Sequence, residues 1–184
     1  RDKSNNIMKV YLVPQQYITQ IYPDIDKYID KLVPTSHGRF EKIDLVNDIL
    51  TGKATLWTVM DEEDDNKIHG IIFTEITTYP RKKMLTISFA SGDNLESWIE
   101  ESLEVLENWA VDNECEAMEI TGRRGWVKKL KSHNWQEEFV IVKKDNLKKN
   151  TLKIVETEKE DGKESRRKQS TSTGRVKDIS KSAS

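Results

Sequence analysis

Two glutamates on expected β-strands are candidates for proton transfer in this chain. Glu75 lies in the strand-like run 67–79, and Glu119 lies in the shorter run 116–121. A strand holds alternate side chains on one face, and a carboxylate held there can accept a proton as a general base. The alternative is that both glutamates are solvent-side strand residues without a chemical role.

The segment 90–96 is a second candidate site, because it joins an expected strand to an expected helix. Asp93 is expected to accept hydrogen bonds from the amides of the first helical turn, and Glu96 completes an acidic relative of the capping box. Free amides at a helix N-terminus bind anions. The residues that could contact an anionic group here are Ser91, Gly92, Asp93, Asn94 and Leu95.

The C-terminal segment 146–184 could bind a partner through its positive charge. It has eleven basic and six acidic residues, a net charge of +5, and the chain total of −2 therefore leaves −7 for residues 1–145. Any binding to nucleic acid would be independent of base sequence, because no aromatic residues are interleaved. A tail that orders on neighbouring subunits, or one that only improves solubility, also agrees with this composition. The candidate contact residues are Arg166, Arg167, Lys168, Arg175 and Lys177.

Composition disfavours several other kinds of site. Cys115 is the single cysteine, which excludes an internal disulfide and a metal site built on cysteines. The three histidines are far apart and show no ligand spacing, so no metal is expected. No apolar run approaches the ~20 residues that cross a bilayer, so no membrane partner is expected.

Hydrophobic periodicity predicts the elements that position these residues. A strand at 10–13 precedes a helical segment at 18–32, which Pro23 is expected to divide into two pieces. A second helix at 40–50 ends near Gly52. The pattern then changes to strand-like runs with turn signals between them. It predicts an antiparallel meander of three strands, at 54–60, 67–79 and 83–90.

The second half of the chain predicts one long helix and three shorter elements. The helix begins at Asp93 and carries a broad apolar stripe, with glutamates mostly on the other side. A strand at 116–121, a short helix at 126–132 and a final strand at 139–143 follow it. A strand, a helix and a strand in this order predict a crossover with parallel pairing.

The expected fold class is α/β, an α+β arrangement with a mixed sheet. It comprises one domain, residues 1–145, and a charged, basic tail, residues 146–184, that is disordered or extended. The order of one strand, two helices, three strands and then helix, strand, helix and strand resembles the GNAT superfamily of N-acetyltransferases. The resemblance also rests on the strand 68–73 after a charged hairpin tip, and on 126–135 before the closing strand, with Asn134-Trp135 in place of Gly-Phe.

The resemblance implies acetyl-CoA as the cofactor of an active member. Such a member binds the pyrophosphate through a loop of pattern Gln/Arg-x-x-Gly-x-Gly/Ala. The segment 90–96 keeps only Gly92 as a glycine, and Asp93 and Glu96 bring negative charge to the phosphate position. An aspartate cap would use the same amides as the coenzyme, and the short helix 126–132 lacks the tyrosine that often protonates the leaving thiolate. These departures favour a protein without acetyltransferase activity and without a cofactor.

Two short segments narrow the resemblance to a divergent GNAT-like group of tailed bacteriophages. Residues 36–40, Ser-His-Gly-Arg-Phe, and the run 122–130 resemble small proteins that are associated there with virion structural genes. The sequence therefore predicts a non-catalytic virion or assembly protein, located in the virion or host cytoplasm, whose partners are other virion proteins. The alternative is an acetyl-CoA-dependent N-acetyltransferase with Glu75 or Glu119 as the base. A third hypothesis is a nucleic-acid-associated protein that acts through its tail.

Overall fold

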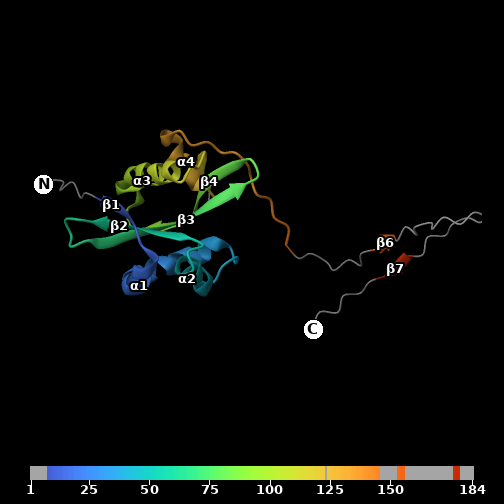
Figure 1. The fold of residues 1–184 in the computed structure, drawn as a ribbon, viewed down its shortest axis with the longest axis horizontal. Coiled ribbons are helices and arrows are strands. Elements are labelled where there is room, and N and C mark those ends of the chain that lie inside the picture. Colours follow the sequence, from blue (N-terminus) through green and yellow to red (C-terminus); the bar gives the residue numbers. More distant parts are fainter. Residues whose placement is uncertain (1–7, 123, 146–152, 156–175, 179–184) are drawn as a thin grey trace, which may run out of the picture. The chain divides into compact units, whose positions relative to one another are not determined.

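A computed structural model describes residues 8–122, 124–145, 153–155 and 176–178. The chain divides into two units, Arg1–Glu137 and Glu138–Ser184. In the first unit a five-stranded sheet lies between two groups of helices, with α1 and α2 on one face and α3 and α4 on the other (Figure 1). This layered arrangement confirms the expected mixed α+β fold.

The sheet has the strand order β1-β2-β3-β4-β5. Strands β1 to β4 are antiparallel neighbours, which confirms the predicted meander. Strand β5 is parallel to β4, because α3 crosses over the sheet between them. The strands are β1 (Met8–Leu12), β2 (Thr55–Asp61), β3 (Lys67–Tyr79), β4 (Lys82–Gly92) and β5 (Ala117–Ile120).

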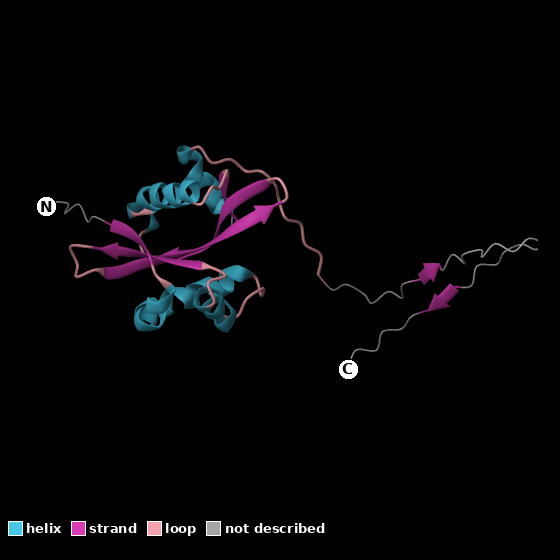
Figure 2. Cartoon of the chain, in the orientation of Figure 1, coloured by secondary structure: helices cyan, strands magenta, loops and turns pink. Residues whose placement is uncertain are grey.

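Helices α1 (Ile18–Leu32) and α2 (Lys42–Leu50) cover the first face of the sheet (Figure 2). The buried stripe of α1 includes Ile25 and Ile29, which belong to one apolar cluster with Ile71 and Phe73 of β3. A reciprocal capping box between Glu41 and the third residue of α2 begins the second helix. Two short 3-10 helices flank α1, at Gln15–Tyr17 and Val33–Ser36.

Pro23 does not divide α1. The helix is continuous through Pro23, so the expectation of two helical pieces is wrong. The proline removes only one backbone hydrogen bond from the helix, at its sixth residue. The buried face that follows, with Ile25, Tyr28, Ile29 and Leu32 each at most 1% exposed, compensates for that loss.

Helices α3 (Ile99–Asp112) and α4 (Arg124–Leu130) cover the second face. Trp57 of β2 and Trp109 of α3 meet edge to face there, with ring centroids 5.5 Å apart. The indole N–H of Trp57 donates to Thr74 Oγ1 over 2.9 Å, so this buried polar group is paired. The tryptophans of this face therefore pack in the core. Two more 3-10 helices, Leu95–Ser97 and Lys131–His133, precede α3 and follow α4.

Strand β4 contains one residue more than its partner, and this bulge is at Ser88. Phe73 pairs with Phe89 while Thr74 pairs with Ile87, so Ser88 has no opposite residue on β3. The pairing of β4 with β5 also ends at Ile87. Beyond this point β4 continues alone on that side, among the residues that the structure describes. The parallel pairing therefore ends next to the bulge, where β5 ends at Ile120.

Two elements differ from the sequence predictions. The long helix begins at Ile99 and not at Asp93, because a 3-10 turn at Leu95–Ser97 precedes it. The second unit has no regular structure in its described residues 138–145, so the predicted strand at 139–143 is wrong. Its apolar side chains, from Phe139 to Val142, are exposed, and exposed apolar side chains contribute little to strand stability.

The second unit also contains two short strands within the segment that the sequence predicts to be a tail. Strand β6 (Lys153–Val155) pairs antiparallel with β7 (Val176–Asp178). Lys177 lies on β7. The other candidate contact residues of the tail lie outside the described residues, and these are Arg166, Arg167, Lys168 and Arg175.

Candidate functional site

The two glutamates predicted as candidate bases lie in one row across three neighbouring strands. Glu75 of β3 pairs with Thr86 of β4, and Thr86 pairs with Glu119 of β5. Directly opposed residues of neighbouring strands share a face of the sheet, and the strands are about 4.8 Å apart, which separates the two glutamate backbones by roughly 10 Å. The fold therefore brings together two carboxylates that are 44 residues apart in the chain.

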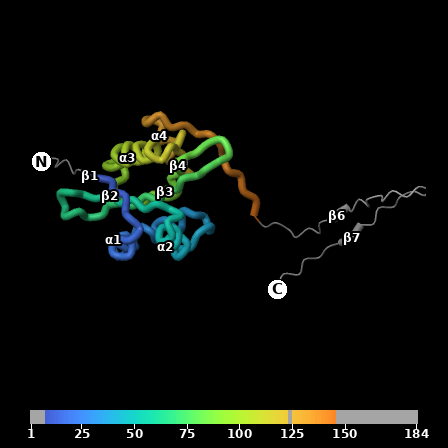
Figure 3. Tube along the Cα trace, in the orientation of Figure 1, coloured from blue at the N-terminus to red at the C-terminus, as the bar shows by residue number. Residues whose placement is uncertain are grey.

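The row of Glu75, Thr86 and Glu119 lies on the sheet face that α1 and α2 cover, at the edge of the area that these helices bury. Phe73 is two residues before Glu75 on the same face of β3 and belongs to the apolar cluster of α1. Toward the tip of the β3–β4 hairpin the side chains become exposed, and Tyr79 is 46% exposed. The hairpin extends past the helices in the tube view (Figure 3). Glu75 and Glu119 are both half-buried, between the core and the open tip.

Hydroxyl groups hold both carboxylates. Ser88, the bulged residue of β4, donates to Glu75 Oε1 over 3.2 Å. Thr86 donates to Glu119 Oε1 over 2.7 Å, and Tyr79 donates to the same oxygen over 3.4 Å. Because Thr86 has only one proton to donate, Thr77 must be the donor in the 2.9 Å contact between the two threonines.

These contacts leave one oxygen of each carboxylate available. Among the described residues, every hydrogen bond to Glu75 and Glu119 ends at Oε1, and neither Oε2 has a partner. A half-buried carboxylate with one oxygen anchored and the other free is oriented to accept a proton or to bind a cation. The structure adds hydroxyl partners that the sequence did not indicate.

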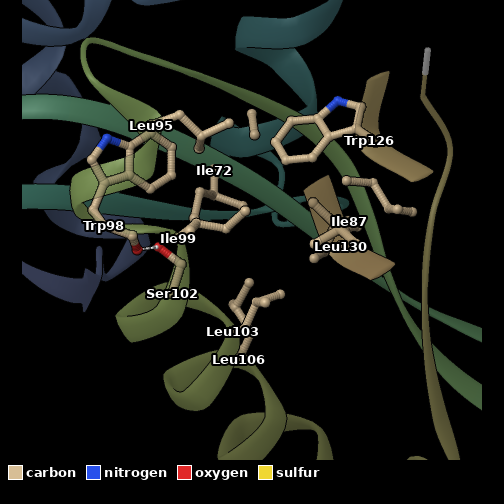
Figure 4. A pocket seen from close by; sticks show the side chains of 12 residues that line it. Ile72, Ile87, Leu95, Trp98, Ile99, Ser102, Leu103, Leu106, Trp126 and Leu130 are labelled. Atoms are coloured by element: carbon tan, nitrogen blue, oxygen red, sulfur yellow. Dashed lines mark hydrogen bonds between the residues drawn. The ribbon is translucent and has the colours of Figure 1, made fainter. Parts of the chain in front are cut away.

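An apolar pocket lies where the pairing of β4 with β5 ends, on the sheet face that α3 and α4 cover (Figure 4). Its volume is about 20 Å³, enough for one water-sized group. The single hydroxyl among the lining side chains is that of Ser102, and it is satisfied by the Trp98 carbonyl at 2.7 Å. The lining residues are Ile72, Ile87, Ala90, Leu95, Trp98, Ile99, Ser102, Leu103, Leu106, Ile120, Trp126 and Leu130.

Asp93 does not cap the helix that follows it. Its carboxylate turns toward α1, where Oδ2 accepts from the Tyr28 hydroxyl and Oδ1 accepts from Lys31 Nζ, each over 3.0 Å. Helix α3 has no side-chain cap at all. The expectation that Asp93 occupies the first-turn amides is therefore wrong, and the reason is that two partners more than 60 residues away offer it a charge-assisted alternative.

The amides of the loop are consequently free to bind another group. In the described structure no group accepts a hydrogen bond from the backbone N–H of Asn94, Leu95 or Glu96, whereas the Asp93 N–H donates to the His69 carbonyl. Asn94 has the left-handed conformation, with φ of 48°. Successive amides next to a left-handed residue form a concave anion-binding site.

The charges around the loop have both signs. Glu96 is paired with Lys129 over 2.8 Å, and Glu101, in the first turn of α3, is paired with Lys9 over 3.2 Å. On the α1 side Lys27 and Lys31 lie over the Tyr28 ring, 4.7 and 5.2 Å from its centroid. Asp93, Glu96 and Glu101 are thus each paired with a lysine, which comes from α1, α4 and β1 respectively.

The Tyr28–Asp93 contact links α1 to the loop and alters the pKa of both groups. Hydrogen bonds from Lys31 and Tyr28 lower the pKa of Asp93. Burial, with the hydrogen bond to Asp93, raises the pKa of Tyr28 to about 12. The Tyr28 hydroxyl also lies 3.0 Å from the Ile68 carbonyl, so it ties β3 and the loop to the same helix.

We expect Tyr28→Phe to lower the free energy of unfolding by about 1.5 kcal/mol at pH 7, because the Asp93 carboxylate and the Ile68 carbonyl lose the buried hydroxyl next to them. In the wild type the pKa of Tyr28 is raised on folding, so its contribution is complete below pH 10 and is lost as the pH rises toward 12. The difference between wild type and variant should therefore shrink above pH 10. Urea unfolding at a series of pH values measures it, and a difference that stays constant up to pH 12 would contradict the assignment.

The described residues form neither a metal-binding cluster nor a membrane-spanning helix. No group of three or more histidine, cysteine, aspartate or glutamate side chains there could hold a metal ion. Likewise, no helix among the described residues is both long and apolar enough to span a bilayer. Cys115 is half-buried and free.

Comparison with known proteins gives similarity at the level of structure. No family model matches the chain, and no curated protein matches it by sequence. A GNAT family acetyltransferase from Staphylococcus aureus is 13% identical with a TM-score of 0.54, over 76% of this chain and 98% of the other. A predicted acetyltransferase with acetyl-CoA from Clostridium acetobutylicum is 10% identical with a TM-score of 0.54, over 76% and 96%.

A third solved structure agrees with these two. An acetyltransferase from Trypanosoma brucei is 7% identical with a TM-score of 0.54, and the match covers 76% of this chain and all of the other. The fold of this protein is therefore GNAT-like, as the element order predicts. Identities this low show the fold alone, and none of these matches supports a bacteriophage virion group.

Proposed function

We propose that this protein is an acetyl-CoA-dependent N-acetyltransferase in which Glu75 is the general base. The observation that carries the proposal is the position of Glu75. It is hydrogen-bonded to the bulged residue Ser88, next to the point where the pairing of β4 with β5 ends. The similarity to acetyltransferases of known structure supports this function over a non-catalytic one.

The residues of the loop fit the polyphosphate of the coenzyme. The backbone N–H groups of Asn94, Leu95 and Glu96 have no partner among the described residues and can donate to phosphate oxygens. The loop pattern of active members begins with Gln or Arg, and this chain has Ala90 at that position. Lys31, which is ion-paired with Asp93, would supply a positive charge instead. The apolar pocket beside β4 and β5 suits the uncharged part of the coenzyme that carries the thioester. Because the pocket is small, side chains of α4 must move to admit it.

The chemistry that the coenzyme supplies when bound is an acetyl group activated as a thioester. The residues of this chain position the amine and take its proton. Ser88 orients Glu75 through Oε1, which leaves Oε2 to accept the proton from the attacking amine. Glu75 is half-buried, at the border of the area that α1 and α2 cover, so this oxygen remains accessible from the side of the hairpin tip.

The non-catalytic interpretation depends on different features. The first turn of α3 contains Glu100 and Glu101, which disfavour anions there, and α4 contains no tyrosine. On this view the protein is a GNAT-like scaffold, and a virion or assembly role would be one use of it. The two functions differ in one measurable property, because only the enzyme binds the coenzyme.

A thermal-shift titration of the full chain with acetyl-CoA tests the proposal. We expect a rise in Tm that saturates with ligand, because a ligand specific for the native state stabilises it. Lys31→Ala should weaken binding about tenfold through the loss of one cation near the phosphates, a change of about 1.4 kcal/mol. Lys53→Ala is the matched control, since Lys53 is also exposed and ion-paired but precedes the end of β2 that pairs with Thr74, away from the end of β3 that adjoins the loop. No shift at millimolar acetyl-CoA would favour the scaffold.

A further inference from the structure

We propose that the acetyl acceptor is a small diamine, whose second ammonium group is bound by Glu119 and Tyr79. The inference rests on the proposed function, and it assigns different roles to the two carboxylates of the row. Glu75 takes the proton from the reacting nitrogen, whereas Glu119 binds the nitrogen that does not react. The carboxylates lie two strands apart, a distance that a chain of a few methylene groups can span.

Only Glu75 lies next to the bulge. The donor that holds its carboxylate is Ser88, which directly follows the last β4 residue paired with β5. Glu119 lies on the far strand of the row, and its Oε1 receives two hydroxyl donors, Thr86 and Tyr79. Two donors fix the orientation of this carboxylate, so its second oxygen is held in one place where it can pair with a cation.

Tyr79 gives the Glu119 end an aromatic wall. Its hydroxyl reaches Glu119 although the two residues lie on β3 and β5, so the side chain must cross β4. The ring is 46% exposed and can lie against a bound cation. A carboxylate beside an exposed aromatic ring binds ammonium groups by charge and by cation–π attraction.

The surface between the two carboxylates is weakly polar. Thr77 and Thr86 direct their hydroxyls to each other and to Glu119, and each side chain also carries an apolar methyl group. In the next row Met84 lies opposite Thr77. Such a surface suits methylene groups between two charged ends. Lys82 shares this face but lies opposite Tyr79, two rows from the carboxylates.

The reaction balances without a further reactant. The acceptor nitrogen forms a bond to the acetyl carbon as the carbon–sulfur bond breaks. The ammonium group loses two protons in the reaction: one passes through Glu75 to solvent and frees the lone pair, and the second leaves the nitrogen as the amide forms and is taken up by the departing thiolate. The second ammonium group keeps its charge throughout and stays paired with Glu119.

Acetyl transfer by the full chain to 1,5-diaminopentane, 1-aminopentane and 5-amino-1-pentanol tests the assignment. We expect the KM of the diamine to be at least tenfold lower than that of either monoamine. Glu119→Gln should remove this difference by raising the KM of the diamine, with kcat changed less than about threefold and the monoamines unaffected. Glu62→Gln is the control, because Glu62 is an exposed glutamate hydrogen-bonded to a different tyrosine, Tyr11.

A binding measurement separates the outcomes. The diamine alone should raise the Tm of the wild type and of Glu75→Gln, but not that of Glu119→Gln. Equal KM values for the diamine and the monoamines would overturn the diamine assignment and leave acetyl transfer intact. The absence of both transfer and acetyl-CoA binding would overturn the proposed function and the inference together.

Discussion

Replacement of Glu75 by glutamine is expected to lower kcat for acetyl transfer by about 10²- to 10⁴-fold, the usual contribution of a positioned general base. Glutamine keeps the shape of the side chain and can still accept the hydrogen bond from Ser88, so the fold and the row of side chains should be preserved. What it lacks is an oxygen that can take a proton. The initial rate of thiol release at saturating amine measures the effect.

Two controls give this result its meaning. The Tm and the acetyl-CoA affinity of Glu75→Gln should match those of the wild type, because Glu75 has no hydrogen bond to the loop or to α1 in the described structure. Ser88→Ala should cause a smaller loss, since it only releases the anchored oxygen of the base. If Glu75→Gln kept more than a third of the wild-type rate, Glu75 would not be the base, and Glu119 would become the candidate.

Replacement of Trp98 by alanine is expected to lower the free energy of unfolding by about 3–5 kcal/mol. Trp98 is 2% exposed and lines the apolar pocket beside Leu106. Its indole N–H donates to the Asp93 carbonyl over 2.9 Å, so it also supports the loop from below. The ring is packed so closely that a Cβ added at Gly92 would lie 2.8 Å from it. The substitution would therefore open a cavity under the proposed phosphate loop.

Urea unfolding measures this effect, and two variants calibrate it. Trp98→Phe keeps most of the buried area but leaves the Asp93 carbonyl without its donor, so about 1–2 kcal/mol is expected. Val111→Ala, at a position that is 67% exposed on the same helix, should change stability by less than about 0.5 kcal/mol. A loss below about 1 kcal/mol in Trp98→Ala would show that the loop does not depend on this packing.

The sequence predicted those elements whose pattern is local. Strand β3 was predicted with its observed ends, Lys67 and Tyr79, because a charged turn precedes it and Pro80 follows it. Helix α2 was predicted for a similar reason, with Gly52 just beyond its end at φ of 76°. These signals involve neighbouring residues, so they act in the same way in any fold.

The predictions that failed depend on residues distant in the chain. Aspartate is a residue type typical of an N-cap. In this fold, however, the carboxylate of Asp93 accepts hydrogen bonds from the buried Tyr28 hydroxyl and the Lys31 ammonium group instead of from the helix amides. Proline is a residue type that usually breaks helices. Here the stabilisation from packing α1 on β3 exceeds the free energy lost with one backbone hydrogen bond. Tertiary contacts of this kind override local propensity.

The sequence by itself determined the order of the elements, the fold class that follows from it, and the presence of carboxylates on the third and fifth strands. Only the tertiary structure decided that Glu75 and Glu119 share a row, that Ser88 is the bulge beside one of them, and that Asp93 turns away from the loop amides. The reason is strand register. A shift of one residue moves a side chain to the opposite face of a sheet, and register is set by cross-strand packing.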